Sequence, residues 1–283
     1  MRPALPALLL GATFIALSPI FVRLSDVGPT ASAFWRVALA APLLWPLLLL
    51  SRPAAPKAID WKLLLAAGFA FAGDLIFWHW SIRFTSVANS TLLANLSAPF
   101  VTLAVWIFWR ERPSGMFTVG LALALVGVVM LVYTSLGFSS TALLGDAFGV
   151  ITALFYAAYI LAVKGLRDRG AATLYVMAVA TTLTAVLLLP VAAASGEPLL
   201  PRSATGWLVL VGLAWVSHCA GQGLIAYSLA HLPAAFSSVG LLLQPVMAAI
   251  FAWLILTEPL VPLQIAGGAV VLLGIYLARR GAA

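Results

Sequence analysis

Residues 86–99 read SVANSTLLANLSAP, and residues 241–245 read LLLQP. Each stretch ends in a proline, and each proline is followed by one glutamate and then by two glycines. The first copy of this pattern is Pro99, Glu111, Gly120 and Gly127, and the second is Pro245, Glu258, Gly267 and Gly274. The spacing from glutamate to the two glycines is identical in both copies, whereas the spacing from proline to glutamate differs by one residue. A pattern repeated in this way indicates two homologous halves.

The composition places the chain in a membrane. Hydrophobic residues make up 64% of its 283 residues and charged residues 8%, which is too little polar surface to cover a soluble domain. A helix needs about 20 apolar residues to cross the hydrocarbon core. Ten such stretches occur, at residues 5–24, 30–50, 63–82, 87–109, 115–134, 146–165, 172–194, 207–229, 235–256 and 261–278. The sequence therefore predicts an all-α membrane protein with ten transmembrane helices.

The two halves are predicted to span residues 1–140 and 141–283, with five helices each. Because five is an odd number, the second half enters the membrane in the opposite orientation, related to the first by a pseudo-twofold axis in the membrane plane. Two inverted five-helix repeats around a central cavity allow a site between them to open to either side in turn. Alternating access is thus the expected mode of action.

The first apolar segment could be taken for a cleaved leader. It has a counterpart in the sixth segment, because Phe14 and Arg23 match Phe155 and Lys164. A cleaved leader would need no such counterpart, so we expect this helix to be retained.

Basic residues predict the orientation. With a cytoplasmic N-terminus, the inner loops and tails hold eleven lysines and arginines, and the outer loops hold three. The inner residues are Arg2, Arg52, Lys57, Lys62, Arg110, Arg112, Lys164, Arg167, Arg169, Arg279 and Arg280, and the outer ones are Arg23, Arg83 and Arg202. Both termini are therefore expected in the cytoplasm. The formal net charge of +7 then reflects topology, and no nucleic-acid partner is expected.

Polar groups inside membrane helices are costly and are functional candidates by default. The third predicted helix carries Phe71, Asp74 and Trp78, and the eighth carries Trp215, His218 and Gln222 at the same spacing. At α-helical periodicity each set shares one face. These two helices are therefore expected to present matched aromatic and polar stripes to the cavity. His79 lies on another side of its helix and is expected to approach the cavity from the outer rim.

The fourth and ninth predicted helices form a second matched pair. Aligning Pro99 with Pro245 sets Thr91 on Ser237, and Asn95 and Gln244 lie within one turn of the prolines. Proline removes a helical hydrogen bond, so each is expected to leave a carbonyl free and to act as a hinge. A third set of residues comes from the first and sixth helices, where Phe14 and Ser18 face Tyr156 and Tyr159 as a wall suited to amphiphilic solutes.

Structural roles remain open for the same residues. Tryptophan and tyrosine often form interfacial belts or pack within a bundle, and His218 could be a neutral packing residue. Arg36 and Asp74 fall at similar depths and could neutralise each other as a structural pair. The motif glutamates fall at helix ends, where carboxylates are often solvated or capping. The paired glycines, seven residues apart, are expected to allow close helix packing.

An enzyme would need convergent carboxylates, a histidine pair at ligand spacing, or a nucleophile beside a base. The sequence shows no His-Glu-x-x-His and no paired intramembrane aspartates. Cys219 is the single cysteine, which excludes an intrachain disulfide framework and a cysteine metal cluster. No catalytic residue, metal or cofactor is expected. A passive channel is less favoured than a carrier, because an inverted repeat with an aromatic cavity suits alternating access.

With these features, the chain resembles the EamA-type ten-helix branch of the drug/metabolite transporter superfamily. The doubled proline, glutamate and glycine pattern carries the resemblance, which covers essentially the whole chain. Within that branch it is similar to YddG-type exporters of aromatic and other neutral amino acids, on its length, its Asp74 to His79 segment and its aromatic lining. No second carboxylate accompanies Asp74, so the coupling ion stays open.

The resemblance implies a monomeric, multi-pass exporter of the bacterial inner (plasma) membrane that moves small amphiphilic metabolites, with neutral or aromatic amino acids first and drugs or other metabolites as the alternative. Its partners would be the solute and the lipid bilayer. The candidate substrate-binding residues are Phe14, Ser18, Asp74, Trp78, His79, Thr91, Asn95, Tyr156, Tyr159, His218, Gln222, Ser237 and Gln244. The candidate hinges are Pro99 and Pro245.

Overall fold

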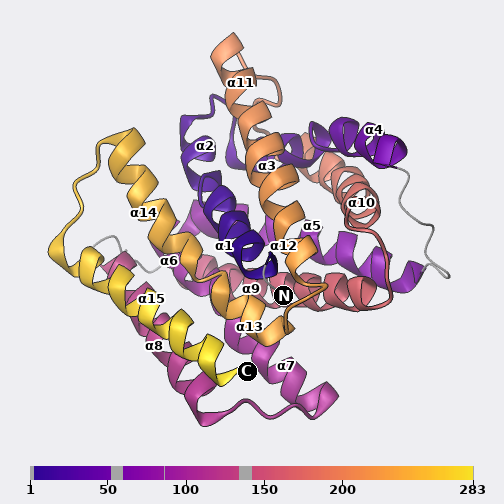
Figure 1. Cartoon of the computed structure of the whole chain (residues 1–283). Coiled ribbons are helices and arrows are strands. Elements are labelled where there is room, and N and C mark those ends of the chain that lie inside the picture. The colour runs from indigo at the N-terminus through magenta and orange to yellow at the C-terminus, as the bar shows by residue number, and fades with distance from the viewer. Residues whose placement is uncertain (1–2, 52–59, 86, 134–141, 283) are drawn as a thin grey trace.

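The computed structural model in Figure 1 describes residues 3–51, 60–85, 87–133 and 142–282, and no strand occurs among them. Ten helical segments are long and apolar enough to cross a membrane. They are Ala4–Leu24, Pro29–Ser51, Trp61–Phe84, Asn89–Trp109, Gly115–Val132, Ala142–Asp168, Thr173–Ala194, Ala204–Ser228, Ala234–Leu256 and Pro262–Gly281. The predicted all-α membrane fold with ten helices is confirmed. The inverted relation of its halves stays a prediction, and the predicted boundary at residues 140 and 141 lies outside the described residues.

Half of the spans are single helices and the others are interrupted. The single helices are α5 (Trp61–Phe84), α8 (Gly115–Val132), α9 (Ala142–Asp168), α10 (Thr173–Ala194) and α15 (Pro262–Gly281). The spans broken in two are α1 (Ala4–Ile15) with α2 (Ser18–Leu24), α3 (Pro29–Ala38) with α4 (Ala41–Ser51), α6 (Val87–Ala94) with α7 (Ser97–Trp109), and α13 (Ala234–Gly240) with α14 (Leu243–Leu256). The eighth span runs from α11 (Ala204–Gly212) through a π-helical segment, η2 (Leu213–Gln222), into α12 (Gly223–Ser228).

Contacts at helix ends show which ends share a side of the membrane. Ser114 Oγ, just before α8, donates to the carbonyl of Gly281 at the end of α15, at 2.7 Å. Arg169, just after α9, pairs with Asp60, just before α5, at 3.1 Å. We call the side that carries these contacts the terminal face.

Another set of contacts joins the ends of other helices. Arg23 near the end of α2 pairs with Glu258 after α14. Asp26, which follows α2, accepts a hydrogen bond from Ser203 Oγ before α11 at 3.1 Å. We call this side the opposite face. The two sets of contacts agree with a chain that crosses the membrane alternately.

Which face is cytoplasmic stays a prediction. The terminal face carries the predicted inner residues Lys164 and Arg169, and the opposite face carries Arg23. Arg2, Arg52 and Lys57 lie outside the described residues.

The doubled motif produces the same helix ending twice. Arg110 directly follows α7 with a φ of 61°, and Thr257 directly follows α14 with a φ of 56°. A residue in the left-handed region ends a helix sharply and turns the chain. The next residue in each copy is the motif glutamate, Glu111 or Glu258. The glutamates therefore mark the turn that leads from a broken helix into the following glycine-bearing helix.

The motif glycines bring α8 and α15 into backbone contact, and Figure 1 shows α15 lying along α8. A Cβ added to Gly120 would lie 2.3 Å from the backbone nitrogen of Ala278, and one added to Gly274 would lie 2.4 Å from that of Ala124. Such distances leave no room for any side chain. The expectation that the paired glycines allow close helix packing is confirmed.

Candidate functional site

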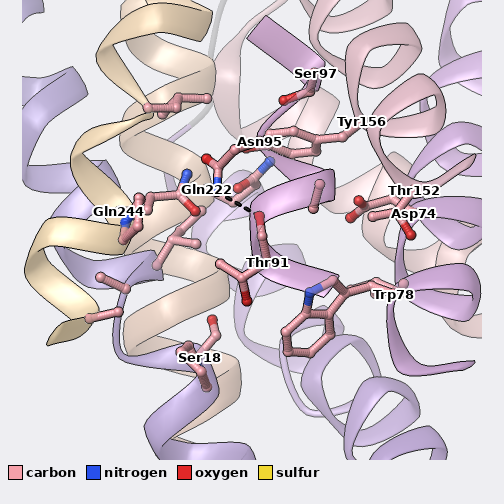
Figure 2. A pocket seen from close by; sticks show the side chains of 18 of the residues that line it. Ser18, Asp74, Trp78, Thr91, Asn95, Ser97, Thr152, Tyr156, Gln222 and Gln244 are labelled. Atoms are coloured by element: carbon pink, nitrogen blue, oxygen red, sulfur yellow. Dashed lines mark hydrogen bonds between the residues drawn. The ribbon is translucent and has the colours of Figure 1, made fainter. Parts of the chain in front are cut away.

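A pocket of about 130 Å³ lies in the middle of the bundle, where several interrupted spans meet. Its walls come from the α1–α2 junction, α3, α5, the α6–α7 junction, α9, η2 and the α13–α14 junction. Figure 2 shows Gln244 on one side of the pocket and Asp74, Thr152 and Trp78 on the other, with Thr91 and Asn95 between them. Both halves of the chain thus contribute to one site.

The two helices that carry the motif prolines break in the same way. α6 and α7 are joined by a break that begins at Asn95, and α13 and α14 by one that begins at Leu241. The amide of Ala98 donates to the carbonyl of Asn95 at 3.2 Å, and the amide of Gln244 donates to that of Leu241 at 2.9 Å.

In an α-helix these two carbonyls would accept from the amides of Pro99 and Pro245, four residues later, but proline has no amide hydrogen. The expectation that each proline leaves a carbonyl free is therefore wrong. The chain tightens locally to bonds between residues three apart, which satisfy the carbonyl and still end the first helix. Pro99 and Pro245 each become the third residue of the second helix, where proline is tolerated, and Pro245 also lines the pocket.

Most of the predicted polar residues line this pocket. They are Ser18, Asp74, Trp78, Thr91, Asn95, Tyr156, Gln222 and Gln244. Their local contacts explain some of their positions: Asn95 Nδ2 donates to the carbonyl of Thr91 at 2.7 Å, which turns the amide along its own helix. The side-chain oxygen of Ser18 is buried and has no hydrogen-bond partner among the described residues, and the buried hydroxyl of Tyr156 has only the amide of Gln222 close to it. The pocket therefore presents unused polar atoms beside an aromatic wall.

Three predicted residues are buried outside the pocket lining. His218 is hydrogen-bonded through Nε2 to Thr181 Oγ1 at 2.8 Å, and its ring lies 5.3 Å from that of Phe71. Tyr159 also packs against Phe71, with 4.8 Å between the centroids of the two rings. His79 is buried, with Nδ1 2.5 Å from the carbonyl of Leu75 on its own helix. None of the three lines the pocket. His79 therefore does not lie at the rim of the cavity, where we expected it.

Phe14, Ser237 and Pro99 also lie outside the pocket lining. The carbonyl of Phe14 accepts a hydrogen bond from Ser217 Oγ at 3.0 Å, which ties α1 to η2. Ser237 is fully buried, and the next residue, Ser238, lines the pocket in its place. The lining position on α13 is therefore shifted by one residue, whereas Gln244 on α14 lines the pocket as predicted.

The predicted stripe on the eighth span is wrong at its first member. Trp215 is 48% exposed on the outside of the bundle, and its indole nitrogen donates to the carbonyl of Leu39 at 3.2 Å. The cause is η2, because a π-helical turn contains more residues than an α-helical turn. Residues at i, i+3 and i+7 then no longer share a face. Gln222, at the end of η2, is the member that reaches the pocket.

Sequence reasoning left several lining residues out of the predicted set. They are Ile15, Ala16, Pro19, Arg36, Phe71, Leu75, Ala94, Ser97, Thr152, Ser238, Leu241 and Ala248. Phe71 was expected on the cavity-facing stripe of Asp74, and Thr152 lies on the stripe of Tyr156, although neither is in the predicted substrate-binding set. The small and apolar ones carry no signal that separates them from ordinary packing residues.

Arg36 is the most consequential residue of that group. It is 8% exposed, it lines the pocket, and its guanidinium lies over the ring of Phe71 at 5.7 Å. None of its nitrogens lies within 4.0 Å of an oxygen of Asp74, so the two do not form the structural ion pair considered above. A cation and a carboxylate thus face the same pocket without contact.

The described residues contain no group of three or more His, Cys, Asp or Glu side chains that could hold a metal ion. What the pocket offers is recognition chemistry: one guanidinium, one carboxylate, amides, hydroxyls and aromatic faces. Such an arrangement binds and releases a small solute and provides no evident nucleophile with a base.

Comparison with known proteins agrees with this geometry. The model of a family described as EamA-like transporters matches residues 2–133 and matches again at residues 143–280. The chain belongs to the EamA-like transporter family. This EamA-family protein is therefore a multi-pass membrane transporter.

A relative and a solved structure extend the comparison. An uncharacterized transporter of Archaeoglobus fulgidus is 29% identical over 289 aligned residues, which cover 95% of the chain and 96% of the relative. A solved structure, described only as the crystal structure of a protein, superposes on this chain with a TM-score of 0.87 at 15% sequence identity. The superposition covers 100% of this chain and 98% of the other chain. That structure shows the similarity of the fold alone.

The two broken helices of this EamA-family transporter are packed together at one end only. α7 runs to the terminal face and packs along α13 there. α6 packs mainly on α9, and α14 packs on α1, so that no comparable α6–α14 contact exists in the described part of the chain. Residues of both α6 and α14 line the pocket. The two broken helices therefore contact each other on the terminal-face side of the pocket and not to a comparable extent on the opposite-face side.

Proposed function

We propose that this protein is a secondary-type exporter that moves small amphiphilic metabolites, chiefly neutral and aromatic amino acids, by alternating access through the central pocket. The observation that carries the proposal is the pocket's position between two helices that break identically at Asn95 and Leu241. Pro99 and Pro245 act as hinges, and the two halves are inverted repeats. Movement of the broken helices would close the opposite face and open the terminal face.

The lining supports a small amphiphilic solute. Trp78, Phe71 and Tyr156 provide aromatic surface, while Asp74 and Gln244 provide polar contacts. Drug-sized ligands occupy pockets of about 300 to 1,000 Å³. The volume of about 130 Å³ therefore favours a single small metabolite over a range of bulky drugs. This is the substrate size expected for a YddG-type amino-acid exporter.

The remaining parts of the proposal concern setting. The excess of basic residues on the terminal side supports cytoplasmic termini in a bacterial inner membrane. The structure would then be the state that faces outward. A monomer suffices, because one chain surrounds the whole pocket. The coupling ion is left open, since Asp74 has no carboxylate neighbour in the pocket lining.

Counterflow into proteoliposomes tests the function. Vesicles loaded with unlabelled phenylalanine and containing purified protein should take up labelled phenylalanine in a saturable way, faster than empty vesicles. Trp78→Leu should reduce this flux by roughly tenfold, because an aromatic contact at the site centre is lost. Trp253→Leu is the matched control, since Trp253 is 50% exposed at the bundle surface. Flux equal to that of empty vesicles, for phenylalanine and other neutral amino acids alike, would refute the proposal.

A further inference from the structure

Arg36 is a buried cation that has no direct ion-pair partner among the described residues. It lies on α3 within the membrane span Pro29–Ser51, and it is 8% exposed. Its Nε is buried without a hydrogen-bond partner, and no described residue forms an ion pair or hydrogen bond with its guanidinium. The face of Phe71, 5.7 Å away, is its one specific neighbour of recorded geometry among the described residues. Buried charges in proteins are normally paired, and Asp74 acts on this cation only from a distance, so the guanidinium donors are free to bind an anion in the pocket.

Unused polar atoms surround the same part of the pocket. Gln222 is 1% exposed and lines the pocket, yet neither its Nε2 nor its Oε1 has a hydrogen-bond partner of normal geometry. The hydroxyls of Tyr156 and Tyr159 lie close to this amide and within electrostatic reach of Arg36. α3, which carries Arg36, packs against η2, which carries Gln222. A guanidinium and an amide donor are thus available together.

Asp74 is the complementary group. It projects from α5 into the pocket near Thr152 and Trp78, as Figure 2 shows. No described residue donates a hydrogen bond to its carboxylate or pairs with it. The oxygens of Asp74 lie more than 4.0 Å from the nitrogens of Arg36, and both side chains line the same pocket. The charges of Arg36 and Asp74 sum to zero. Because they lie apart, one part of the pocket is positive and another is negative.

We propose that Arg36 and Gln222 bind a carboxylate of the solute and that Asp74 binds its ammonium group, so that the pocket selects zwitterions. The inference rests on the proposed function in that the solute bound here is the one transported. A guanidinium presents a planar fork of donors that matches a carboxylate, and the amide of Gln222 adds a further donor. The apolar body of the solute then lies along the aromatic wall of Phe71 and Trp78.

Two-point recognition makes the pocket reject close analogues. An amine that lacks the carboxylate leaves Arg36 unpaired in a buried site, and an acid that lacks the amino group leaves Asp74 unpaired. Sites built around a polar group discriminate strongly against ligands that cannot satisfy it. The arrangement therefore predicts preference for the zwitterion over both analogues of equal shape.

Equilibrium binding to the purified full-length protein in detergent tests this assignment. The probes are phenylalanine, phenethylamine and 3-phenylpropionate, which share the ring and differ in the head group. Phenylalanine should bind at least roughly tenfold more tightly than either analogue, the order expected for one hydrogen-bonded charge. Arg36→Gln should weaken phenylalanine and phenylpropionate by that factor and leave phenethylamine unchanged or tighter. Asp74→Asn should weaken phenylalanine and phenethylamine and spare phenylpropionate.

Controls remove one charge elsewhere. Arg280→Gln alters an arginine that lies over Tyr276 near the C-terminus, and Asp168→Asn alters the partner of Lys164. Both should bind all three probes as the unmodified protein does. If Arg36→Gln does not fold, Arg36→Lys keeps the charge and loses the fork, and it should weaken phenylalanine and phenylpropionate without weakening phenethylamine.

Equal binding of the three probes, binding of none of them, or the same loss for all three in both variants would overturn the assignment. Failure of the proposed function has a different signature. Head-group selectivity with the expected variant pattern but no flux in proteoliposomes would refute transport and keep the binding site. Saturable phenylalanine flux that neither variant changes would keep transport and refute the binding site.

Discussion

The doubled motif builds two regions that differ in kind. Its glycines form the α8–α15 contact, where backbone meets backbone and no side chain fits. Its prolines sit at the α6–α7 and α13–α14 breaks, where the chain is interrupted beside a pocket. The same repeated pattern thus supplies a close packing interface and a pair of helix breaks, which we propose are hinges. The glycine contact is symmetric between the halves, whereas the broken helices pack together only at the terminal face.

This contrast assigns different consequences to neighbouring parts of one motif. A change in the glycine contact should destabilise the fold, because the helices cannot separate without losing a large packed area. A change at a proline should leave the fold intact and alter movement. In the proposed transport cycle, the asymmetry of the broken helices corresponds to one state, and small changes at their ends should shift the balance of states.

The largest expected effect comes from filling the glycine contact. Gly127→Leu places a side chain where a Cβ alone would lie 2.6 Å from the backbone nitrogen of Val271. Overpacking of this kind costs on the order of 3 kcal/mol or more. We expect loss of folded protein or a large fall in the unfolding temperature in detergent. Gly115→Leu on the same helix, where nothing lies within 4 Å, is the control and should stay stable. Equal stability of the two variants would contradict the role of the α8–α15 glycine contact as a close packing interface.

Removal of the hinges comes next in size. Pro99→Ala with Pro245→Ala removes the steric cause of both breaks and allows α6 to continue into α7 and α13 into α14. We expect flux in proteoliposomes to fall by about tenfold, a change of about 1.4 kcal/mol in the limiting barrier, with an unchanged or higher unfolding temperature. Pro262→Ala, at the first residue of α15, is the control and should transport normally. Normal flux in the double variant would show that the breaks are not hinges.

The smallest effect concerns the motif glutamates. Glu258 pairs with Arg23 on the opposite face, whereas Lys164, the counterpart of Arg23, pairs with Asp168 and not with Glu111. The Arg23–Glu258 pair therefore belongs to the state described here. Both side chains are largely exposed, at 64% and 44%, so the pair is worth about 0.2 to 1 kcal/mol.

Cysteine labelling measures that shift. In a Cys219→Ser background, Thr91→Cys places a thiol in the pocket. Glu258→Gln should slow its reaction with a membrane-impermeant maleimide from the opposite face by about twofold. Glu111→Gln removes the equivalent carboxylate that has no ion pair among the described residues, and it should not slow the reaction. If Glu258→Gln and Glu111→Gln slowed the reaction equally, the two motif glutamates would not differ in their effect on the state of the protein, contrary to this account.

Much of the fold was accessible from the sequence, because apolar length and repeated spacing directly reflect membrane thickness and helix packing. The ten spans, the glycine contact and eight of the pocket residues follow from those patterns. Two of the errors share one cause, which is local departure from α-helical geometry. The tight turn before Pro99 satisfied a carbonyl expected to be free, and η2 turned Trp215 out of the cavity. Such departures depend on tertiary packing, which one sequence does not display.

Arg36 shows another limit of sequence reasoning. Its depth was predicted, and a structural pair with Asp74 was a sound expectation for two opposite charges in a membrane. Whether two such side chains meet depends on helix rotation and on neighbours such as Phe71. Periodicity on separate helices does not fix that relation. The separation of the two charges became visible only when the helices were placed together.

Distances across the two faces of the bundle, each measured to the end of a broken helix, test the central claim most directly. In a Cys219→Ser background, spin labels at Arg110→Cys and His231→Cys report on the terminal face, and labels at Phe84→Cys and Thr257→Cys report on the opposite face; all four positions are exposed. With phenylalanine on both sides of the vesicle, we predict a second population in each pair, longer on the terminal face and shorter on the opposite face. A single unchanged distance in both pairs, in vesicles that show saturable flux, would contradict alternating access at these helices.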